Sequence, residues 1–130
     1  MLQKLFSKLV VVTALTLPIF GSVQVAKAQS TYGATAYSAT TDATGISWDH
    51  ATKQAALNAA VRFCNEETGG ANDCKALTYN RNNCGAIAVG TGGAGAGWGD
   101  DQEAAEAQAL AACSELDGGN CKIKLSACND

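Results

Sequence analysis

This sequence contains few basic residues and few of the side chains that build metal or catalytic centres. Nine Lys and Arg residues stand against twelve Asp and Glu residues, His50 is the one histidine, and no Cys-x-x-Cys pair occurs. Nucleic acids and anionic membranes are bound through clustered Lys and Arg, so the composition argues against both as partners. A zinc site is disfavoured as well, because the usual ligand spacing is missing.

Long hydrophobic runs are also scarce, and the one that stands out lies near the start of the chain. Leu9–Phe20 is apolar but shorter than the roughly 20 residues that a membrane-spanning helix needs. Lys4 and Lys8 precede it, and Ala26-Lys27-Ala28 supplies small residues where a signal peptidase reads them. We therefore predict that residues 1–28 are a cleavable signal peptide and that the mature protein is secreted or periplasmic, without a membrane span.

The mature chain is expected to be one small acidic domain. Residues 29–130 keep six of the nine basic residues, because Lys4, Lys8 and Lys27 belong to the signal, and all twelve acidic ones, which gives a formal net charge of −6. The length is that of a single domain. Solubility alone accounts for an acidic surface.

The cysteines predict covalent cross-links. All six lie in the mature part. An even number of cysteines in a small exported chain predicts a disulfide framework, because export compartments are oxidising. Six cysteines allow fifteen pairings. The residues are Cys64, Cys74, Cys84, Cys113, Cys121 and Cys128.

The second half of the mature chain repeats the first, which predicts a single duplicated domain with copies at about residues 32–83 and 84–130. Two copies are too few for an open solenoid, so we expect them to close on each other around a pseudo-twofold axis. The matched blocks are Gly33–Ala36 with Gly85–Ala88, Gly45–Trp48 with Gly95–Trp98, Thr52–Cys64 with Asp101–Cys113, and Gly69–Lys75 with Gly118–Lys122.

Each copy is expected to fold as strand, strand, helix, strand, which places the chain in the α+β class. The segments Thr40–Gly45 and Gly90–Gly95 are small, polar or glycine-rich, as hairpin turns are. The helices that follow are rich in alanine, which favours helix intrinsically. Thr52 and Asp101 are the expected N-caps, because their side-chain oxygens can accept from the first free backbone amides.

The last strand differs between the copies. In the second copy Ile123, Leu125 and Ala127 alternate with polar residues, which predicts a strand with one apolar face. The counterpart at Lys75–Tyr79 does not keep this alternation in the aligned register. The mismatch indicates a bulge or a shift of one residue.

The repeat also constrains the disulfides. Cys64 is equivalent to Cys113, and Cys74 to Cys121. A bridge from the end of each helix to the third strand predicts Cys64–Cys74 and Cys113–Cys121. The remaining pair, Cys84–Cys128, then joins the ends of the two copies.

Several blocks resemble a known family of exported bacterial proteins, catalogued as domain of unknown function 4189. The resemblance covers nearly all of the mature chain and implies bacterial origin and export. It implies no activity, cofactor or catalytic residue, because the shared pattern consists mostly of glycines, small residues and cysteines that determine the fold. The blocks are Tyr32–Ser38, Gly45–Trp48, Thr52–Cys64 and Cys84–Ala88.

The segments just before the two helices are the candidate binding site. Trp48 and Trp98 occupy equivalent positions there, and we expect them to face each other across the pseudo-twofold axis. Exposed tryptophans of this kind recur in binding hot spots. The alternative is that each ring packs in the core while a nearby aspartate caps its helix. The full candidate set is Trp48, Asp49, His50, Trp98, Asp100 and Asp101.

Three catalytic or ligand-binding interpretations find less support. His50 could serve as a general base for Ser47 or Ser38, but the spacing matches no known triad motif. The six glycines within 90–99 lack the Gly-Lys-Ser/Thr ending of a phosphate loop. The acidic residues 100–103 lack the alternating oxygen ligands of an EF-hand. We therefore predict no metal and no cofactor.

The favoured hypothesis is a non-catalytic exported module that binds a protein or an envelope component. The chain is small, expected to be rigidly cross-linked, and poor in clustered titratable groups. One alternative is a small secreted hydrolase that acts on envelope polymers with Asp and Glu as acid and base. Another is a secreted effector or an inhibitor of a secreted enzyme. A carboxylate or histidine with a perturbed pKa inside a cleft would favour the enzyme over the binding module.

Overall fold

The computed structural model describes residues 29–130, and the predicted signal peptide lies outside the described residues. It contains two units of the same element order, so the predicted α+β class and strand-strand-helix-strand repeats are confirmed. The first unit is β1 (Tyr32–Tyr37), β2 (Thr44–His50), α1 (Lys53–Glu66) and β3 (Lys75–Arg81), and the second is β4 (Cys84–Gly90), β5 (Gly93–Gly99), α2 (Gln102–Ser114) and β6 (Lys122–Cys128).

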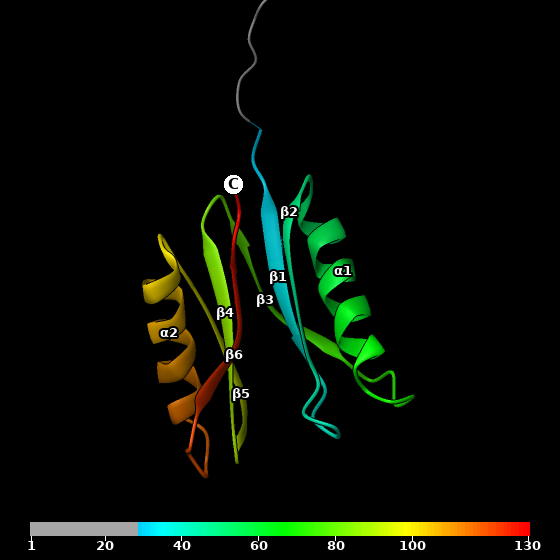
Figure 1. Cartoon of the computed structure of the whole chain (residues 1–130), viewed down its shortest axis with the longest axis vertical. Helices are drawn as coiled ribbons and strands as arrows, with labels where there is room; N and C mark the ends of the chain where they lie inside the picture. Colours follow the sequence, from blue (N-terminus) through cyan, green and yellow to red (C-terminus); the bar gives the residue numbers. More distant parts are fainter. Residues whose placement is uncertain (1–28) are drawn as a thin grey trace, which may run out of the picture.

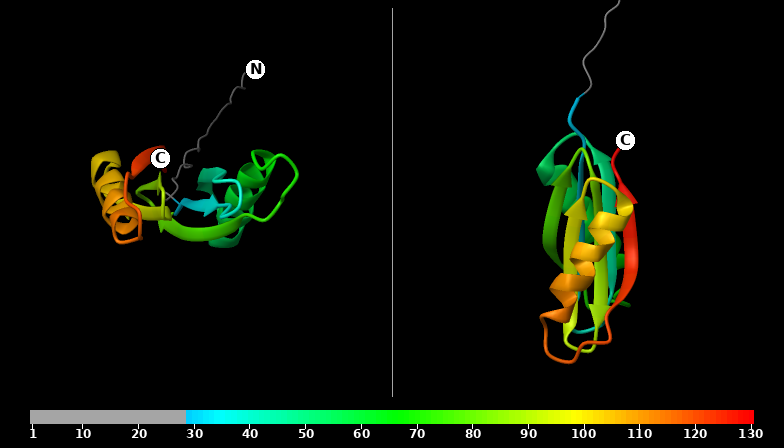
Figure 2. Two further views of the ribbon diagram at one scale, coloured as in Figure 1. Left: turned by 90° about the horizontal axis from the view of Figure 1, so that it is seen from below. Right: turned by 90° about the vertical axis from the view of Figure 1, so that its left-hand side faces the viewer.

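The two units stack as four layers (Figure 1). Each forms an antiparallel three-stranded sheet, in the order β2-β1-β3 or β5-β4-β6, with its helix on one face. The two uncovered sheet faces meet in the middle, and the helices form the outer layers (Figure 2). There β2 lies against β6, β3 against β5, and β1 against β4. Exchanging the units preserves this pattern, as the predicted pseudo-twofold relation requires.

Small side chains let each helix lie close to its sheet. Thr52 and Asp101 are the N-caps, as predicted, and their side chains accept from the backbone N–H of Ala55 at 3.1 Å and of Ala104 at 2.8 Å. Behind each cap, alanines and one cysteine form the buried face of the helix, which satisfies the small-residue pattern of the sequence. These buried residues are Ala56, Ala59, Ala60 and Cys64 in α1, and Ala105, Ala109 and Cys113 in α2.

The second helix approaches its sheet more closely than the first along the edge strand. A Cβ added at Gly95, Gly97 or Gly99 of β5 would come within 2.2, 2.5 or 2.6 Å of an atom of α2. The position equivalent to Gly97 in β2 carries Ser47, whose hydroxyl donates to the Ala56 carbonyl of α1 at 2.8 Å. At this position α1 therefore leaves room for a side chain above β2, whereas α2 leaves none above Gly97.

Both third strands contain a bulge: the one that the sequence indicated within Lys75–Tyr79 is present, and β6 has one despite its regular alternation. In β6, Ile123 pairs with Ala88 and Leu125 with Ile87, so Lys124 is an extra residue. The bulge turns Ile123 toward α2, while Leu125 lies on the Ile87 face toward the first sheet. The prediction that Ile123 and Leu125 share one face is therefore wrong. The equivalent bulge in β3 falls at Leu77.

Three disulfides cross-link the described residues, in the pairing that repeat symmetry predicts. Cys64–Cys74 and Cys113–Cys121 each tie the end of a helix to the segment that leads into the third strand. Cys84–Cys128 joins residues that are direct partners in β4 and β6. Within residues 29–130, no helix is both long enough and apolar enough to cross a membrane.

Candidate functional site

Both tryptophans of the predicted site are exposed to the same extent, but the fold keeps them apart. Each indole is 50% accessible, so neither ring belongs to the core. Trp48 is near the end of β2 and Trp98 near the end of β5. Because β2 lies against β6 and β5 against β3, these two strands occupy diagonally opposite edges of the stacked sheets. The expectation that the rings face each other is wrong.

The polar residues beside the tryptophans take separate positions. Asp49 has a φ of 61°, and its backbone N–H donates to Asn129 Oδ1 at 2.7 Å. Its carboxylate accepts from the Asp130 N–H at 2.7 Å, so Asp49 connects the end of β2 to the segment Asn129–Asp130. His50 pairs with Tyr32 in the sheet.

The acidic residues before α2 have local positions of their own. Asp101 caps the helix, and Asp100 is exposed next to it. Nowhere in the part of the chain that the structure describes do three or more His, Cys, Asp or Glu side chains gather in a way that could hold a metal ion.

The serines suggested as nucleophiles have structural partners. The Ser38 hydroxyl donates to Asp73 Oδ1 at 2.6 Å, and the Ser47 hydroxyl donates to the Ala56 carbonyl at 2.8 Å. Both serines are buried. The hydrogen bonds from Ser38 and then Thr40 lower the pKa of Asp73 below its ordinary value of 3.8. This cluster ties the β1–β2 turn to the segment before β3.

Two further groups have a perturbed pKa: hydrogen bonds from Gln102 and Ser126 lower the pKa of Glu106 on α2, and Tyr37 lies at a turn. Burial, and then a hydrogen bond to Asp42 together with the charge of that carboxylate, raise the pKa of Tyr37 to about 12. The phenol therefore stays protonated throughout the physiological range. Its contact with Asp42 closes the hairpin between β1 and β2.

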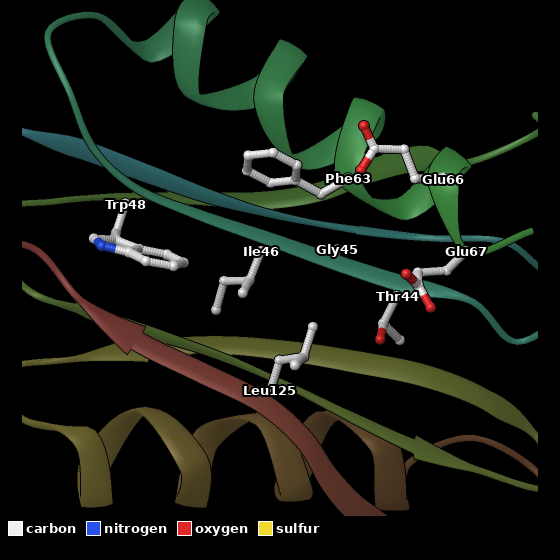
Figure 3. A pocket seen from close by; sticks show the side chains of 8 residues that line it. All are labelled: Thr44, Gly45, Ile46, Trp48, Phe63, Glu66, Glu67 and Leu125. Carbon is white, nitrogen blue, oxygen red and sulfur yellow. The ribbon is translucent and has the colours of Figure 1, made fainter.

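A groove of about 430 Å³ runs along β2, and one residue of the predicted site, Trp48, lines it. Trp48 and Ile46 lie on its floor, Phe63 of α1 lines one wall, and Leu125 of β6 lines the other (Figure 3). Glu66 and Glu67 lie at the end opposite Trp48. An apolar centre with a few charged groups at its rim is the usual make-up of a binding pocket.

The groove contains residues that the sequence reasoning missed. Among the candidates named in advance, only Trp48 lines it. Comparison of the two copies carries the missing signal, since at equivalent positions the first edge has the larger apolar side chain. The pairs are Ile46 with Ala96, Phe63 with Ala112, and Leu125 with Thr78.

At the equivalent edge, a side chain of α2 covers one backbone group of β5. The backbone N–H of Trp98 donates to Gln108 Oε1 at 2.7 Å, so α2 satisfies a group that points away from β4. The residue of α1 at the Gln108 position is Ala59, which has no polar side-chain group. The two edges of the fold are therefore chemically different, although their tryptophans match.

The fold and the site define a class of protein: two β-β-α-β units, cross-linked by disulfides, with an apolar groove at the edge of one sheet. The chain belongs to the family described as domain of unknown function DUF4189, whose family model matches residues 32–128. This confirms the resemblance noted in the sequence.

Relatives and a solved structure agree with this membership. The chain is 39% identical over 104 residues to Protein Rv1269c of Mycobacterium tuberculosis and to Protein Mb1300c of Mycobacterium bovis, covering 80% of this chain and 74% of each relative. The NMR structure of Rv1813c from Mycobacterium tuberculosis is similar with a TM-score of 0.53 at 26% identity, covering 88% of this chain and 98% of that one. The likeness supports a shared fold.

Proposed function

We propose that this chain is an exported, non-catalytic binding module that captures a protein partner through the groove along β2. In this proposal residues 1–28 are removed as a signal peptide, and residues 29–130 act as one duplicated domain outside the cytoplasm. Three disulfides support such a location, because disulfides form and persist in oxidising compartments.

The observation that carries the proposal is the exposure of large apolar side chains around one groove. Trp48 is 50% accessible and Phe63 is 37% accessible, and both line it. Exposed aromatic side chains that gather around a concavity mark interaction sites. Tryptophan is enriched in binding hot spots, because it buries a large area and keeps a polar N–H.

The cross-linked fold suits a binding role. Each wall of the groove comes from an element held by a disulfide, since Cys64–Cys74 holds the end of α1 and Cys84–Cys128 holds the end of β6. A preformed surface loses little conformational entropy when a partner binds, which favours affinity.

The test compares two matched variants. We expect Trp48→Ala to abolish capture of a partner from secreted and envelope fractions, and Trp98→Ala to leave capture intact. Because each ring is half exposed, either truncation should destabilise the fold by about half of the 3–5 kcal/mol of a buried tryptophan. Thermal melts verify that both variants are folded. Equal loss of capture in the two variants would contradict the proposal, and so would capture that survives Trp48→Ala.

A further inference from the structure

We propose that the groove binds an extended peptide segment of a partner protein, which adds as a strand to the free edge of β2 and places a basic residue against Glu66 and Glu67. This inference rests on the proposed function, since it names the partner chemistry of the same groove. Strand addition derives its affinity from main-chain hydrogen bonds and its specificity from alternate side chains.

The backbone of β2 is oriented for such an addition. β2 pairs with β1 on one side and forms the edge of its sheet. In β5, the strand equivalent to β2, the Trp98 N–H points away from β4. The peptide groups of a strand point to the same side at every second residue, so those of Ala96 also point away from β4. Ile46 of β2 is the counterpart of Ala96, because Ile46 pairs with Thr35 in the first sheet and Ala96 pairs with the equivalent residue, Ile87, in the second. The peptide groups of Ile46 and Thr44 therefore point away from β1, toward the groove.

The walls of the groove match the two faces of an added strand. Successive side chains of a strand point to opposite faces. On one face they would meet Phe63 of α1, and on the other Leu125 of β6 (Figure 3). Apolar side chains at alternate positions of the peptide would bury these two residues, together with the exposed half of Trp48.

The charges of the groove select a basic end for the peptide. Glu66 and Glu67 are the only ionisable residues among the eight that line it. Both lie at the C-terminal end of α1, where the helix dipole adds partial negative charge and favours a cation. Arg62, the nearest basic residue in the helix, is stacked over the Phe63 ring at 4.9 Å. The basic residue of the peptide should therefore lie beside Thr44, at the end of the groove opposite Trp48.

The same charges argue against a second copy of this chain as the occupant. Pairing of β2 with its own copy in antiparallel orientation would place the two glutamates beside the partner's Trp48 end. That end offers Asp49, and the next basic residue along the chain, Lys53, is stacked over the Tyr79 ring at 4.2 Å. A self-paired edge would thus bury acidic groups without a compensating cation.

The test uses defined peptide libraries and a single fluorescent reporter. The chain has two tryptophans, so Trp98→Phe makes Trp48 the sole reporter while leaving the groove unchanged. One heptapeptide library has two lysines at one end followed by alternating Thr and Val, Ile or Phe. A second replaces the lysines by glutamates, and the best binders are remade with N-methyl groups on alternate backbone nitrogens.

The expected result has four parts. Lysine peptides bind and shift Trp48 emission, whereas glutamate peptides do not. N-methylation, which removes the edge hydrogen bonds but keeps the side chains, weakens binding at least tenfold. Glu66→Gln and Glu67→Gln each weaken it about two- to fivefold, as expected for exposed ion pairs. Amide hydrogen exchange slows at Thr44 and Ile46 and not at their counterparts Ala94 and Ala96.

Three results would overturn the inference. In the first, peptides bind at Trp48 but N-methylation has no effect, which rejects strand addition while the proposed function stands. In the second, no lysine peptide binds although capture of a natural partner still depends on Trp48. In the third, Ile46 becomes protected with rising protein concentration and no peptide, which identifies a second copy as the occupant. The proposed function itself fails if Trp48→Ala and Trp98→Ala capture a partner equally well, and this outcome is measured independently of the peptides.

Discussion

Replacing Gly97 by alanine is expected to disrupt the contact that keeps the second edge of the fold closed. Gly97 lies in β5 beneath α2, and a Cβ there would come 2.5 Å from the Ala109 nitrogen and 2.7 Å from the Gln108 Cβ. The nitrogen is a backbone atom of the helix, so no side-chain rotation relieves the clash. Either α2 or β5 has to move.

The size of the effect follows from this distance. Non-bonded heavy atoms sit at about 3.5–4.0 Å, so the helix would need to shift outward by about 1 Å. The Cys113–Cys121 disulfide resists that shift, because it holds the end of α2 to the segment before β6. Overpacking of this kind costs about 1–3 kcal/mol. For a domain of this size that corresponds to a fall in melting temperature of roughly 5–20 °C.

Thermal and chemical unfolding of the oxidised protein measure the change, and the other copy supplies the control. Ser47 is the equivalent of Gly97 in β2, and its hydroxyl donates to Ala56. Ser47→Ala should lose only that hydrogen bond, worth about 1 kcal/mol. Exchange of the Trp98 amide should accelerate in Gly97→Ala, since Gln108 is displaced with the helix. A Gly97→Ala protein as stable as wild type, with Trp98 still protected, would refute the close approach of α2.

Three further predictions concern titration and cross-linking. Because the pKa of Tyr37 is raised to about 12, the stability from its protonated phenol is present below pH 10 and is lost as the pH rises toward 12; a phenolate absorbance phase near pH 12 should vanish in Tyr37→Phe. The pKa of Asp73 is lowered, so its contribution is present above pH 3.8 and is lost as the pH falls below that value; melting curves of wild type and Asp73→Asn should differ at neutral pH and converge in acid. Removing Cys84–Cys128, which spans 44 residues, should destabilise the fold by about 4 kcal/mol on the chain-entropy model, against about 2.5–2.7 kcal/mol for either shorter bridge. Urea titration of the three double Cys→Ala variants measures the loss of stability for each bridge. A smaller loss for Cys84–Cys128 than for either shorter bridge would contradict the prediction.

The element order and the disulfides were accessible from the sequence because local patterns and repetition encode them. Thr52 and Asp101 act as caps through hydrogen bonds to amides three residues away. The equivalence of Cys64 with Cys113 reduces the possible pairings to those that respect the repeat. Such features require no knowledge of how the two sheets stack.

The groove was not accessible in the same way, because three separate elements create it. Ile46, Phe63 and Leu125 belong to a strand, a helix and a strand of the other unit. Leu125 reaches the groove only because the bulge at Lys124 turns it away from α2. The separation of Trp48 from Trp98 likewise depends on which strands oppose each other between the sheets. Those relations arise from packing and leave no periodic signal in the chain.

The edges of the two sheets differ in a way that bears on function. An exposed, regular and apolar edge strand invites unwanted pairing, and proteins usually protect such strands with bulges, charges or covering groups. In this fold β3 and β6 each have a bulge and begin with a lysine, and Gln108 covers the backbone of β5 at Trp98.

The edge of β2 lacks these protections over the stretch that faces the groove. Its register with β1 is regular from Thr44 to Ser47, and its own irregularity falls between Ser47 and His50, at Trp48 and Asp49. The exposed Trp48 and Phe63 sit beside this open stretch, where they increase the risk of aggregation. The equivalent positions of the other unit carry Ala96 and Ala112 in place of Ile46 and Phe63, and there Gln108 accepts from the Trp98 N–H. One unit thus satisfies the edge amide of its tryptophan, whereas the other presents an open apolar edge, and this difference is our reason for proposing that the β2 edge binds a ligand.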